Sequence, residues 1–155
     1  MTVLVVAHSI EVRMSLVYGR GVYAIRRLPK GTSIDLYEGK RYTSEQLMNV
    51  DWHKRHGGMT YLFSLSDGMT IDGAQGGNAT RFLNHCCEPN CEAVEEIEPN
   101  GGIRLRVLTT KTLAAGSELF IDYALVIDES ETPAAYKCRC GALTCRGSMA
   151  VLPIT

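Results

Sequence analysis

The chain has 155 residues, of which 45% are hydrophobic and 21% are charged, and its formal net charge at pH 7 is −1. That length is enough to bury a hydrophobic core in one domain without disulfides. The near-neutral charge argues against the broad basic face that non-specific nucleic-acid binding needs, and no run approaches the roughly 20 apolar residues of a membrane span. We therefore expect direct binding neither to nucleic acid nor to a membrane.

Short strands separated by turns are expected along most of the chain. The first ten residues, MTVLVVAHSI, lack the basic start of a signal peptide and predict a strand. Other segments are rich in β-branched and aromatic residues and are bounded by glycine or proline. The sequence PNGG at 99–102 predicts a hairpin turn before a strand of alternating polarity. The expected strands are residues 3–7, 11–17, 21–25, 32–38, 59–65, 69–73, 103–110 and 117–123.

Two helices are predicted between these strands. The sequence TSEQ, starting at Thr43, matches a capping box in which Gln46 reaches back to the first residue, and the helix is expected to end at Gly57-Gly58. A second, short helix starts near Asn78. No internal repeat or low-complexity linker is present, so the sequence predicts one β-rich domain with a cysteine-bearing tail.

The six cysteines fall into two clusters of three. Without an export signal, clustered cysteines are more often metal ligands or catalytic groups than disulfides. The second cluster has a C-x-C-x4-C spacing, from which three thiolates can converge on one tetrahedral zinc, and the fourth ligand must come from the first cluster. The alternative, small buried hydrophobes, is less well supported because the tail has few apolar residues. The clusters are Cys86, Cys87 and Cys91, and Cys138, Cys140 and Cys145.

A different possibility for the sequence NHCCEPNC (84–91) is a cysteine nucleophile with a histidine base. Adjacency in sequence does not show that His85 faces a thiol, and a zinc site already requires at least one of these cysteines. The residues of this stretch alone leave the choice open.

Four motifs, taken in order, resemble those of the SET-domain protein lysine methyltransferases, followed by a post-SET zinc motif. GRGVYA with LYEG is similar to the cofactor loop and the turn after it, and RFLNHCCEPNC, ELFIDY and CRCGALTC are similar to the remaining motifs. The resemblance runs from about residue 15 to residue 149. It implies a mainly β SET-domain fold of several small sheets with short helices and a knot-like C-terminal region. The implied domains are 1–125, with a short insert at 40–60, and a zinc-bound post-SET tail at 126–155.

The resemblance also implies S-adenosylmethionine as the cofactor. Gly19 and Gly21 would let the backbone approach it closely, and Asn84 and His85 would hold its amino-acid and adenine parts, so the histidine binds rather than acts as a base. For Met149, plain core packing is an equally good alternative. The implied cofactor-binding residues are Tyr18, Gly19, Arg20, Gly21, Tyr61, Arg81, Asn84, His85, Arg139 and Met149.

For the reaction itself, the resemblance implies that Tyr123 is catalytic and that Tyr61 contacts cofactor and substrate lysine. Ile121 stands where the family usually has Phe or Tyr, which leaves room for a methylated amine and predicts methylation beyond the first methyl. The implied zinc ligands are Cys87, Cys138, Cys140 and Cys145, with Cys86 and Cys91 as buried thiols.

The expected function is therefore methyl transfer from S-adenosylmethionine to a lysine of a protein, at family level a histone tail. The glutamates of CEAVEEIE (91–98) could attract a basic tail or form a solvated strand edge. The alternatives are a SET-fold binding or scaffold module without turnover and a zinc-stabilised structural protein. We expect an intracellular protein, nuclear or cytoplasmic, or a bacterial or viral protein acting on host or self proteins. The sequence indicates no oligomeric state.

Overall fold

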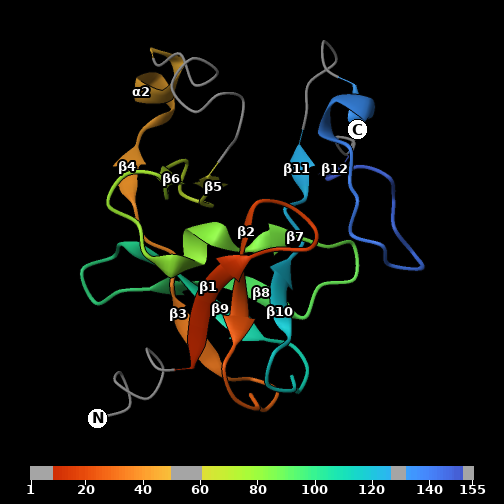
Figure 1. Ribbon diagram of the computed structural model, residues 1–155. Coiled ribbons are helices and arrows are strands. Elements are labelled where there is room, and N and C mark those ends of the chain that lie inside the picture. Colours follow the sequence, from red (N-terminus) through yellow and green to blue (C-terminus); the bar gives the residue numbers. More distant parts are fainter. Residues whose placement is uncertain (1–8, 50–60, 127–131, 152–155) are drawn as a thin grey trace. The chain divides into compact units, whose positions relative to one another are not determined.

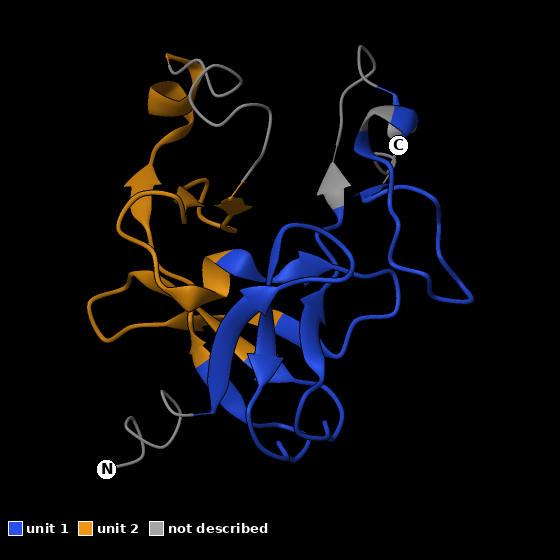
Figure 2. Cartoon of the chain, viewed as in Figure 1, with its two compact units in different colours: residues 1–34, 82–92, 108–155 blue, residues 35–81, 93–107 orange. Residues whose placement is uncertain are grey.

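The computed structural model describes residues 9–49, 61–126 and 132–151 (Figure 1). The chain forms two compact units, shown in Figure 2. Unit 1 comprises residues 1–34, 82–92 and 108–155, and unit 2 comprises residues 35–81 and 93–107. Within the described ranges, no helix is long and apolar enough to cross a membrane.

The main sheet of unit 1 has four strands in the order β1-β2-β10-β7. β1 and β10 both pair antiparallel with β2, whereas β7 pairs parallel with β10. Val22 on β2 is opposite Leu119 on β10, and both side chains are fully buried, so this face of the sheet is the core of the unit. The strands are β1 (Ile10–Met14), β2 (Arg20–Ala24), β7 (Asn84–His85) and β10 (Glu118–Ile121).

The C-terminal part of unit 1 returns to the end of this sheet. β11 (Leu125–Val126) follows β10 almost directly and pairs parallel with β12 (Ala150–Val151). A 3-10 helix, η2 (Pro133–Tyr136), precedes the cysteine-bearing loop. The Met149 N–H donates to the Tyr136 carbonyl, which closes this loop at its base. The tail is thereby anchored just after the end of β10.

Unit 2 contains a second small sheet in the order β4-β6-β5, with antiparallel pairing throughout. Its core consists of the buried residues Tyr37, Leu65, Ile71, Ile103 and Leu105. A further sheet, in the order β3-β9-β8, has strands that each run through both units. The elements are β3 (Ser33–Leu36), β4 (Lys40–Tyr42), α2 (Ser44–Met48), β5 (Leu62–Ser64), β6 (Thr70–Asp72), η1 (Ala79–Phe82), β8 (Cys91–Ile97) and β9 (Ile103–Thr109).

The predicted mainly β architecture of several small sheets and short helices is confirmed. β9 alternates buried and half-buried residues as predicted. The PNGG turn closes a hairpin in which the Glu98 N–H donates to the Gly102 carbonyl and the Gly101 N–H donates to the Glu98 carbonyl. The predicted strand at 3–7 lies outside the described residues, as does the beginning of the one at 59–65. The knot-like C-terminal region stays a prediction, as does the division at residue 125.

The predicted capping box is confirmed, but the predicted end of its helix is wrong. Gln46 N–H donates to Thr43 Oγ1, and Thr43 N–H donates to Gln46 Oε1. The helix then ends at Met48, because Asn49 adopts a non-helical cap and its N–H closes a tight last turn on the Gln46 carbonyl. The short helix after Asn78 is a 3-10 helix, and Asn78 Oδ1 accepts from the Thr80 N–H at its start.

Candidate active site

Tyr123 directly follows β10 and is held at three points. Its backbone N–H donates to His85 Nδ1 at 2.9 Å, its hydroxyl donates to the Leu83 carbonyl at 2.5 Å, and its ring meets the His85 ring edge-on at a centroid distance of 5.4 Å. The parallel pairing of β7 with β10 places these groups together. The hydrogen bond to Leu83 fixes the direction of the phenol O–H.

His85 is buried, and both of its ring nitrogens have partners. Since Nδ1 accepts from Tyr123, a neutral ring carries its proton on Nε2, which lies 3.4 Å from Cys87 Sγ. Burial lowers the pKa of His85; the Asp122 carboxylate opposes this shift and the Arg146 guanidinium adds to it. A ring nitrogen that already carries a proton cannot take one from a thiol. This geometry argues against the cysteine nucleophile with a histidine base.

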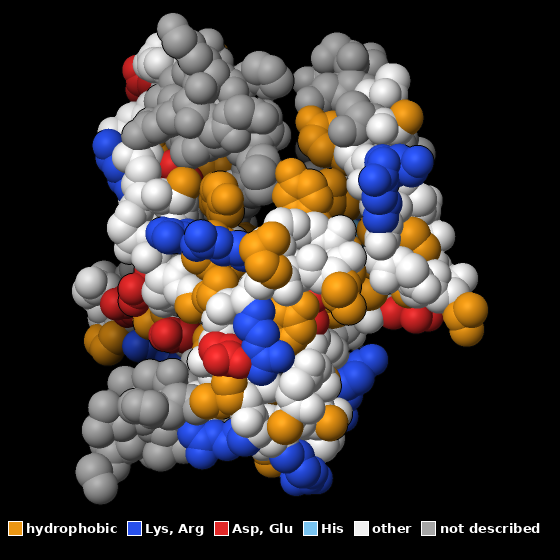
Figure 3. All heavy atoms as spheres, in the orientation of Figure 1, with side chains coloured by type: hydrophobic (Ala, Val, Ile, Leu, Met, Phe, Trp, Pro, Cys, Tyr) orange, Lys and Arg blue, Asp and Glu red, His pale blue; other side chains and the backbone are white. Residues whose placement is uncertain are grey.

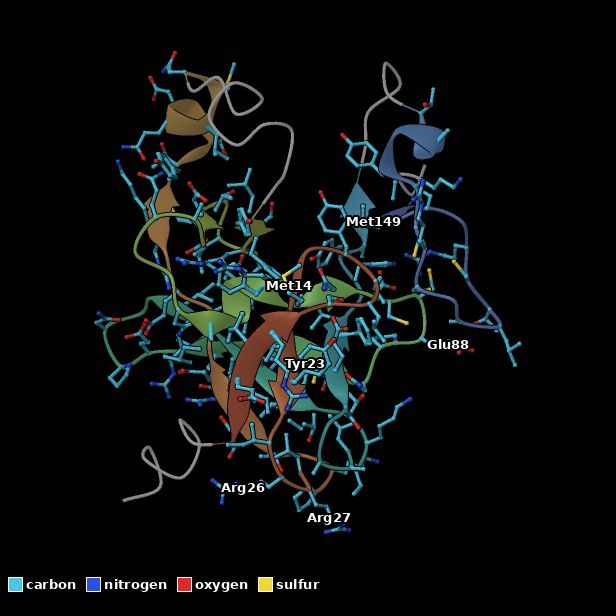
Figure 4. All side chains as sticks on the ribbon, viewed as in Figure 1. Met14, Tyr23, Arg26, Arg27, Glu88 and Met149 are labelled. Atoms are coloured by element: carbon cyan, nitrogen blue, oxygen red, sulfur yellow. The ribbon has the colours of Figure 1, made fainter. Side chains whose placement is uncertain are left out.

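Glu118, the first residue of β10, is the centre of a hydrogen-bond network that no sequence motif predicted. Its carboxylate accepts from Ser15 Oγ at 2.9 Å, from the Tyr23 hydroxyl at 3.1 Å and from Asn84 Nδ2 at 2.9 Å. Tyr23 is labelled in Figure 4, on β2. Burial and the neighbouring Glu118 carboxylate raise the pKa of Tyr23. The network joins three strands and the loop between β1 and β2. Its only sequence signal was the glutamate that begins ELFIDY.

Asn84 connects this network to the loop that precedes β2. Its Nδ2 lies 3.0 Å from the Tyr18 carbonyl and 3.0 Å from the Arg20 carbonyl, besides its contact with Glu118. The side chain is 7% exposed. In the part of the chain that the structure describes, no donor reaches Asn84 Oδ1. A buried amide oxygen is usually hydrogen-bonded, so Asn84 Oδ1 is an acceptor for a donor group of a ligand or for a water.

The two glycines of the predicted cofactor loop have different reasons to be glycine. Gly19 has a φ of 47°, a backbone conformation that residues with a side chain rarely adopt. The space where a Cβ atom would lie is open. At Gly21, a Cβ atom would lie 2.4 Å from Glu118 Oε2, so a side chain here would displace the carboxylate. Tyr18 is 58% exposed, and the Arg20 guanidinium lies over the Phe82 ring at 5.7 Å.

The remaining predicted site residues lie in several places. Ile121 is 2% exposed on β10, and its register partner on β7 is His85. Met149, labelled in Figure 4, directly precedes the β12 residue that pairs with Leu125. Arg139 is exposed in the tail. Tyr61 and Arg81 belong to unit 2.

Tyr61 is half-buried in unit 2. Its carbonyl accepts from the Tyr37 hydroxyl at 2.6 Å and from the Gly73 N–H at 3.0 Å, so its backbone is fixed at the start of β5.

Four cysteine sulfurs converge: those of the tail, whose spacing predicted it, and that of Cys87, which the resemblance implied. The Sγ atoms lie within 4.8 Å of one another, with Cys87 3.8 Å from Cys138 and 3.9 Å from Cys145. Four thiolates bound at about 2.3 Å to a tetrahedral zinc would lie about 3.8 Å apart, so this cluster could hold such an ion. Burial would raise the pKa of the Cys140 thiol, but hydrogen bonds from the Cys87 and Ala142 backbone lower it to about 6.

Backbone N–H groups support this cysteine cluster from the tail. Arg146 N–H donates to Cys87 Sγ at 3.3 Å, and Gly147 N–H donates to Cys145 Sγ at 3.4 Å. The two other cysteines of the chain stay outside the cluster and are buried, as expected: Cys86 is 7% exposed and Cys91 is 1% exposed. Burial raises the pKa of Cys91 to about 12.

An ion pair joins the end of β10 to the tail. Arg146 donates from both terminal nitrogens to the Asp122 carboxylate, at 2.8 and 3.0 Å. Burial alone would raise the pKa of Asp122, but the hydrogen bonds from Arg146 and from the Ala124 N–H hold it below its usual range. Because Asp122 precedes Tyr123 and Arg146 follows Cys145, this pair links the candidate active site to the cysteine cluster.

Comparison with known proteins identifies the family to which this chain belongs. Human histone-lysine N-methyltransferase SETD2 is 36% identical over 141 residues, covering 90% of this chain and 5% of that protein. Human SUV39H2, also named a histone-lysine N-methyltransferase, is 34% identical over 146 residues, covering 83% and 36%. Drosophila melanogaster trithorax is 29% identical over 133 residues, covering 85% and 3%. The chain thus spans only a small part of the curated relatives it matches. A model of the SET domain matches residues 19–124, and the chain therefore belongs to the SET-domain family.

Proposed function

We propose that the protein is an S-adenosylmethionine-dependent protein-lysine N-methyltransferase that acts on a histone. The observation that carries the proposal is Tyr123, whose backbone is bound to His85 and whose hydroxyl is bound to Leu83 directly after β10, in a chain of the SET-domain family. The relatives named above bear the name of that activity.

The residues around Asn84 fit such a cofactor. S-adenosylmethionine carries an α-amino group, which is a hydrogen-bond donor, and Asn84 Oδ1 is a buried acceptor that receives no donor from residues 9–49, 61–126 and 132–151. The open, left-handed Gly19 and the exposed Tyr18 leave the neighbouring loop accessible. Both ring nitrogens of His85 are engaged, so its contribution would come from its backbone or ring edge. We propose that Tyr18, Gly19, Arg20, Gly21, Tyr61, Arg81, Asn84, His85, Arg139 and Met149 form the cofactor site.

When bound, the sulfonium cofactor supplies an electrophilic methyl group. The attacking lysine amine must be neutral and aligned, although at pH 7 a lysine with a pKa near 10.4 is neutral in fewer than about one molecule in a thousand. The Tyr123 oxygen accepts an N–H of the amine and so directs its lone pair, and Tyr61 is the second residue proposed to contact it. Desolvation in a half-buried site lowers the pKa of the amine. With His85 engaged, the proton leaves to water, and the rate should rise with pH below the pKa of the amine.

We further propose that the four clustered cysteines bind zinc. The sulfur distances match a tetrahedral site, and the N–H donors from Arg146 and Gly147 support thiolate charge. Binding would draw together Cys87, beside the candidate active site, and the three cysteines of the tail. Zinc would thereby contribute directly to folding the tail.

The proposal on the number of methyl groups added rests on Ile121. It offers no hydroxyl to hold a competing water and is smaller than an aromatic residue, so we propose that the enzyme adds more than one methyl group. Mass spectrometry of a modified peptide that shows only monomethyl-lysine at long times would refute this. Ile121→Phe, which fills the space, should shift the product toward monomethyl-lysine.

The activity is tested by incubating the protein with methyl-labelled S-adenosylmethionine and mixed histones. We expect label on lysine, and a loss of at least about a hundredfold in rate for Tyr123→Phe, since one positioned acid-base or orienting group contributes about this much. Tyr136→Phe, in the tail, is the matched control and should keep the rate within about threefold. Cofactor binding without transfer would instead support a SET-fold scaffold.

A further inference from the structure

Unit 1 carries a cationic surface at the end of its main sheet that lies away from Tyr123. The two segments that form it are residues 25–34, which follow β2, and residues 108–117, which precede β10. They contain two arginines and two lysines and no acidic residue. We call this surface the cationic platform; its charged residues are Arg26, Arg27, Lys30 and Lys111, all exposed.

Backbone hydrogen bonds fix the two segments of the cationic platform to each other. Leu28 and Leu113 exchange backbone bonds at 2.9 and 2.8 Å, and both side chains are buried. The Lys30 N–H donates to Thr112 Oγ1 at 3.2 Å, and Gly31 N–H donates to the Thr109 carbonyl at 2.9 Å. The backbone that carries these cations is therefore already ordered. Binding a partner there should lose little backbone conformational entropy.

The figures agree with this distribution of charge. Figure 4 labels Arg26 and Arg27 at the lower end of unit 1, where both side chains point outward from the loops. Figure 3 shows Lys and Arg side chains, and no Asp or Glu, along that lower end on the face in view. The near-zero net charge of the chain is an average that conceals this local excess.

We infer that the cationic platform binds the phosphate backbone of duplex DNA. Arginine is suited to phosphate because its planar fork can donate two parallel hydrogen bonds. Proteins that bind single strands stack bases on aromatic side chains, and neither segment contains an aromatic residue. Protein interfaces need apolar anchors, and Ile25, 43% exposed, is the only large hydrophobic residue that these two segments expose. A double helix read through its phosphates needs neither feature.

The position of the platform leaves the candidate active site open. β2 begins beside the proposed cofactor loop and ends at the platform, and β10 runs the opposite way toward Tyr123. The five residue steps from Arg20 to Ile25 span roughly 16 Å at the rise of an extended strand. DNA held at one end of the sheet would therefore not cover the residues at the other end. A protein substrate that is itself bound to DNA could occupy both sites.

The test is fluorescence anisotropy of a labelled 20-base-pair duplex at several salt concentrations. If four phosphates are neutralised, log K should fall with log salt with a slope of about −3.6, and Arg26→Gln/Arg27→Gln should reduce it to about −1.8. The double variant Lys30→Gln/Lys111→Gln should reduce the slope by the same amount. The inference can then still be tested if one of the two double variants fails to fold. The matched control, Lys40→Gln/Arg41→Gln, removes two exposed cations of unit 2 and should leave the slope unchanged.

Three outcomes would overturn the inference. The first is a wild-type slope near zero, and the second is an equal loss of slope in the control pair. The third is displacement of the duplex by poly-glutamate at equal charge concentration, which would identify an acidic protein as the partner. The DNA-binding measurement involves no methyl transfer. Its result therefore does not depend on whether the protein has the proposed methyltransferase activity.

Discussion

The cysteine cluster and the Glu118 network both hold parts of the candidate site, but only one of them is visible in the sequence. Three of the four clustered cysteines lie within eight residues, and their chemistry is nearly specific to metal binding. Glu118 gathers Ser15, Tyr23 and Asn84 from positions up to 103 residues away, with side chains that are common everywhere. Local spacing reveals the part of a site that one loop contributes, whereas a network formed by strand pairing can be recognised only once the paired strands are known.

The largest effect is expected where the cysteine cluster is broken. Cys138→Ser removes one of four proposed zinc ligands, and we expect at least a hundredfold weaker zinc binding, which corresponds to about 2.7 kcal/mol. Elemental analysis of the purified variant should find well under one zinc per chain, against one for the wild type, and thermal unfolding should begin at a lower temperature.

Cys91→Ala is the control, because Cys91 is equally a buried cysteine but lies outside the cluster. It should keep one zinc per chain while losing some stability. A Cys138→Ser protein that retains one zinc would show that the cluster is not the metal site.

The next effect is expected in the Glu118 network. Glu118→Gln replaces a carboxylate that accepts three hydrogen bonds by an amide that is itself a donor, so the Asn84 amide and the loop at Tyr18 lose their fixed position. Hydrogen bonds to a charged group contribute about 1.5–3 kcal/mol, so calorimetry should show cofactor binding weakened roughly 10- to 100-fold. Zinc content should be unchanged, which separates this network from the cysteine cluster.

Glu88→Gln provides the matched control for that variant. Glu88, labelled in Figure 4, is an exposed glutamate of the same unit that accepts from Thr144 Oγ1 at 2.6 Å. Its substitution should leave cofactor affinity within about twofold. Equal effects of the two substitutions would mean that Glu118 contributes only general stability or charge.

A smaller effect is expected from the ion pair that joins the two regions. The pKa of Asp122 is lower in the folded protein than in the unfolded chain, so the pair stabilises the fold above the unfolded value and this contribution is lost as the pH falls through the folded value. At pH 7 Asp122→Asn should cost up to about 1 kcal/mol, the range for partly exposed pairs.

The pH dependence is the sharper part of that prediction. The difference in free energy of unfolding between wild type and Asp122→Asn should shrink steadily below about pH 4, the usual range of an aspartate. Urea unfolding at several pH values measures it. A difference that stays constant from pH 7 to pH 3 would show that the charge of Asp122 is not what stabilises the fold.

The sequence predicted the capping box at Thr43 and the convergence of the three tail cysteines, because each depends on residues near one another in the chain. The small-sheet architecture and the joining of Cys87 to the cluster were implied by the resemblance to a family. The sequence failed at the end of the helix, since Asn49 ends it without glycine or proline. It explained Gly21 by a ligand, whereas Glu118, 97 residues later, leaves no room for a side chain there. The sequence also did not predict that both ring nitrogens of His85 have hydrogen-bond partners, because the β7–β10 pairing is what brings Tyr123 to His85.

The central claim is that a methyl-donor cofactor binds beside Asn84 and Tyr123, and a crystal structure with S-adenosylhomocysteine tests it most directly. We predict that the amino group of the ligand lies within hydrogen-bond distance of Asn84 Oδ1 and that the ligand contacts the loop at Tyr18 and Gly19. A ligand bound elsewhere in the chain, or one that leaves Asn84 Oδ1 without a donor, would contradict the account.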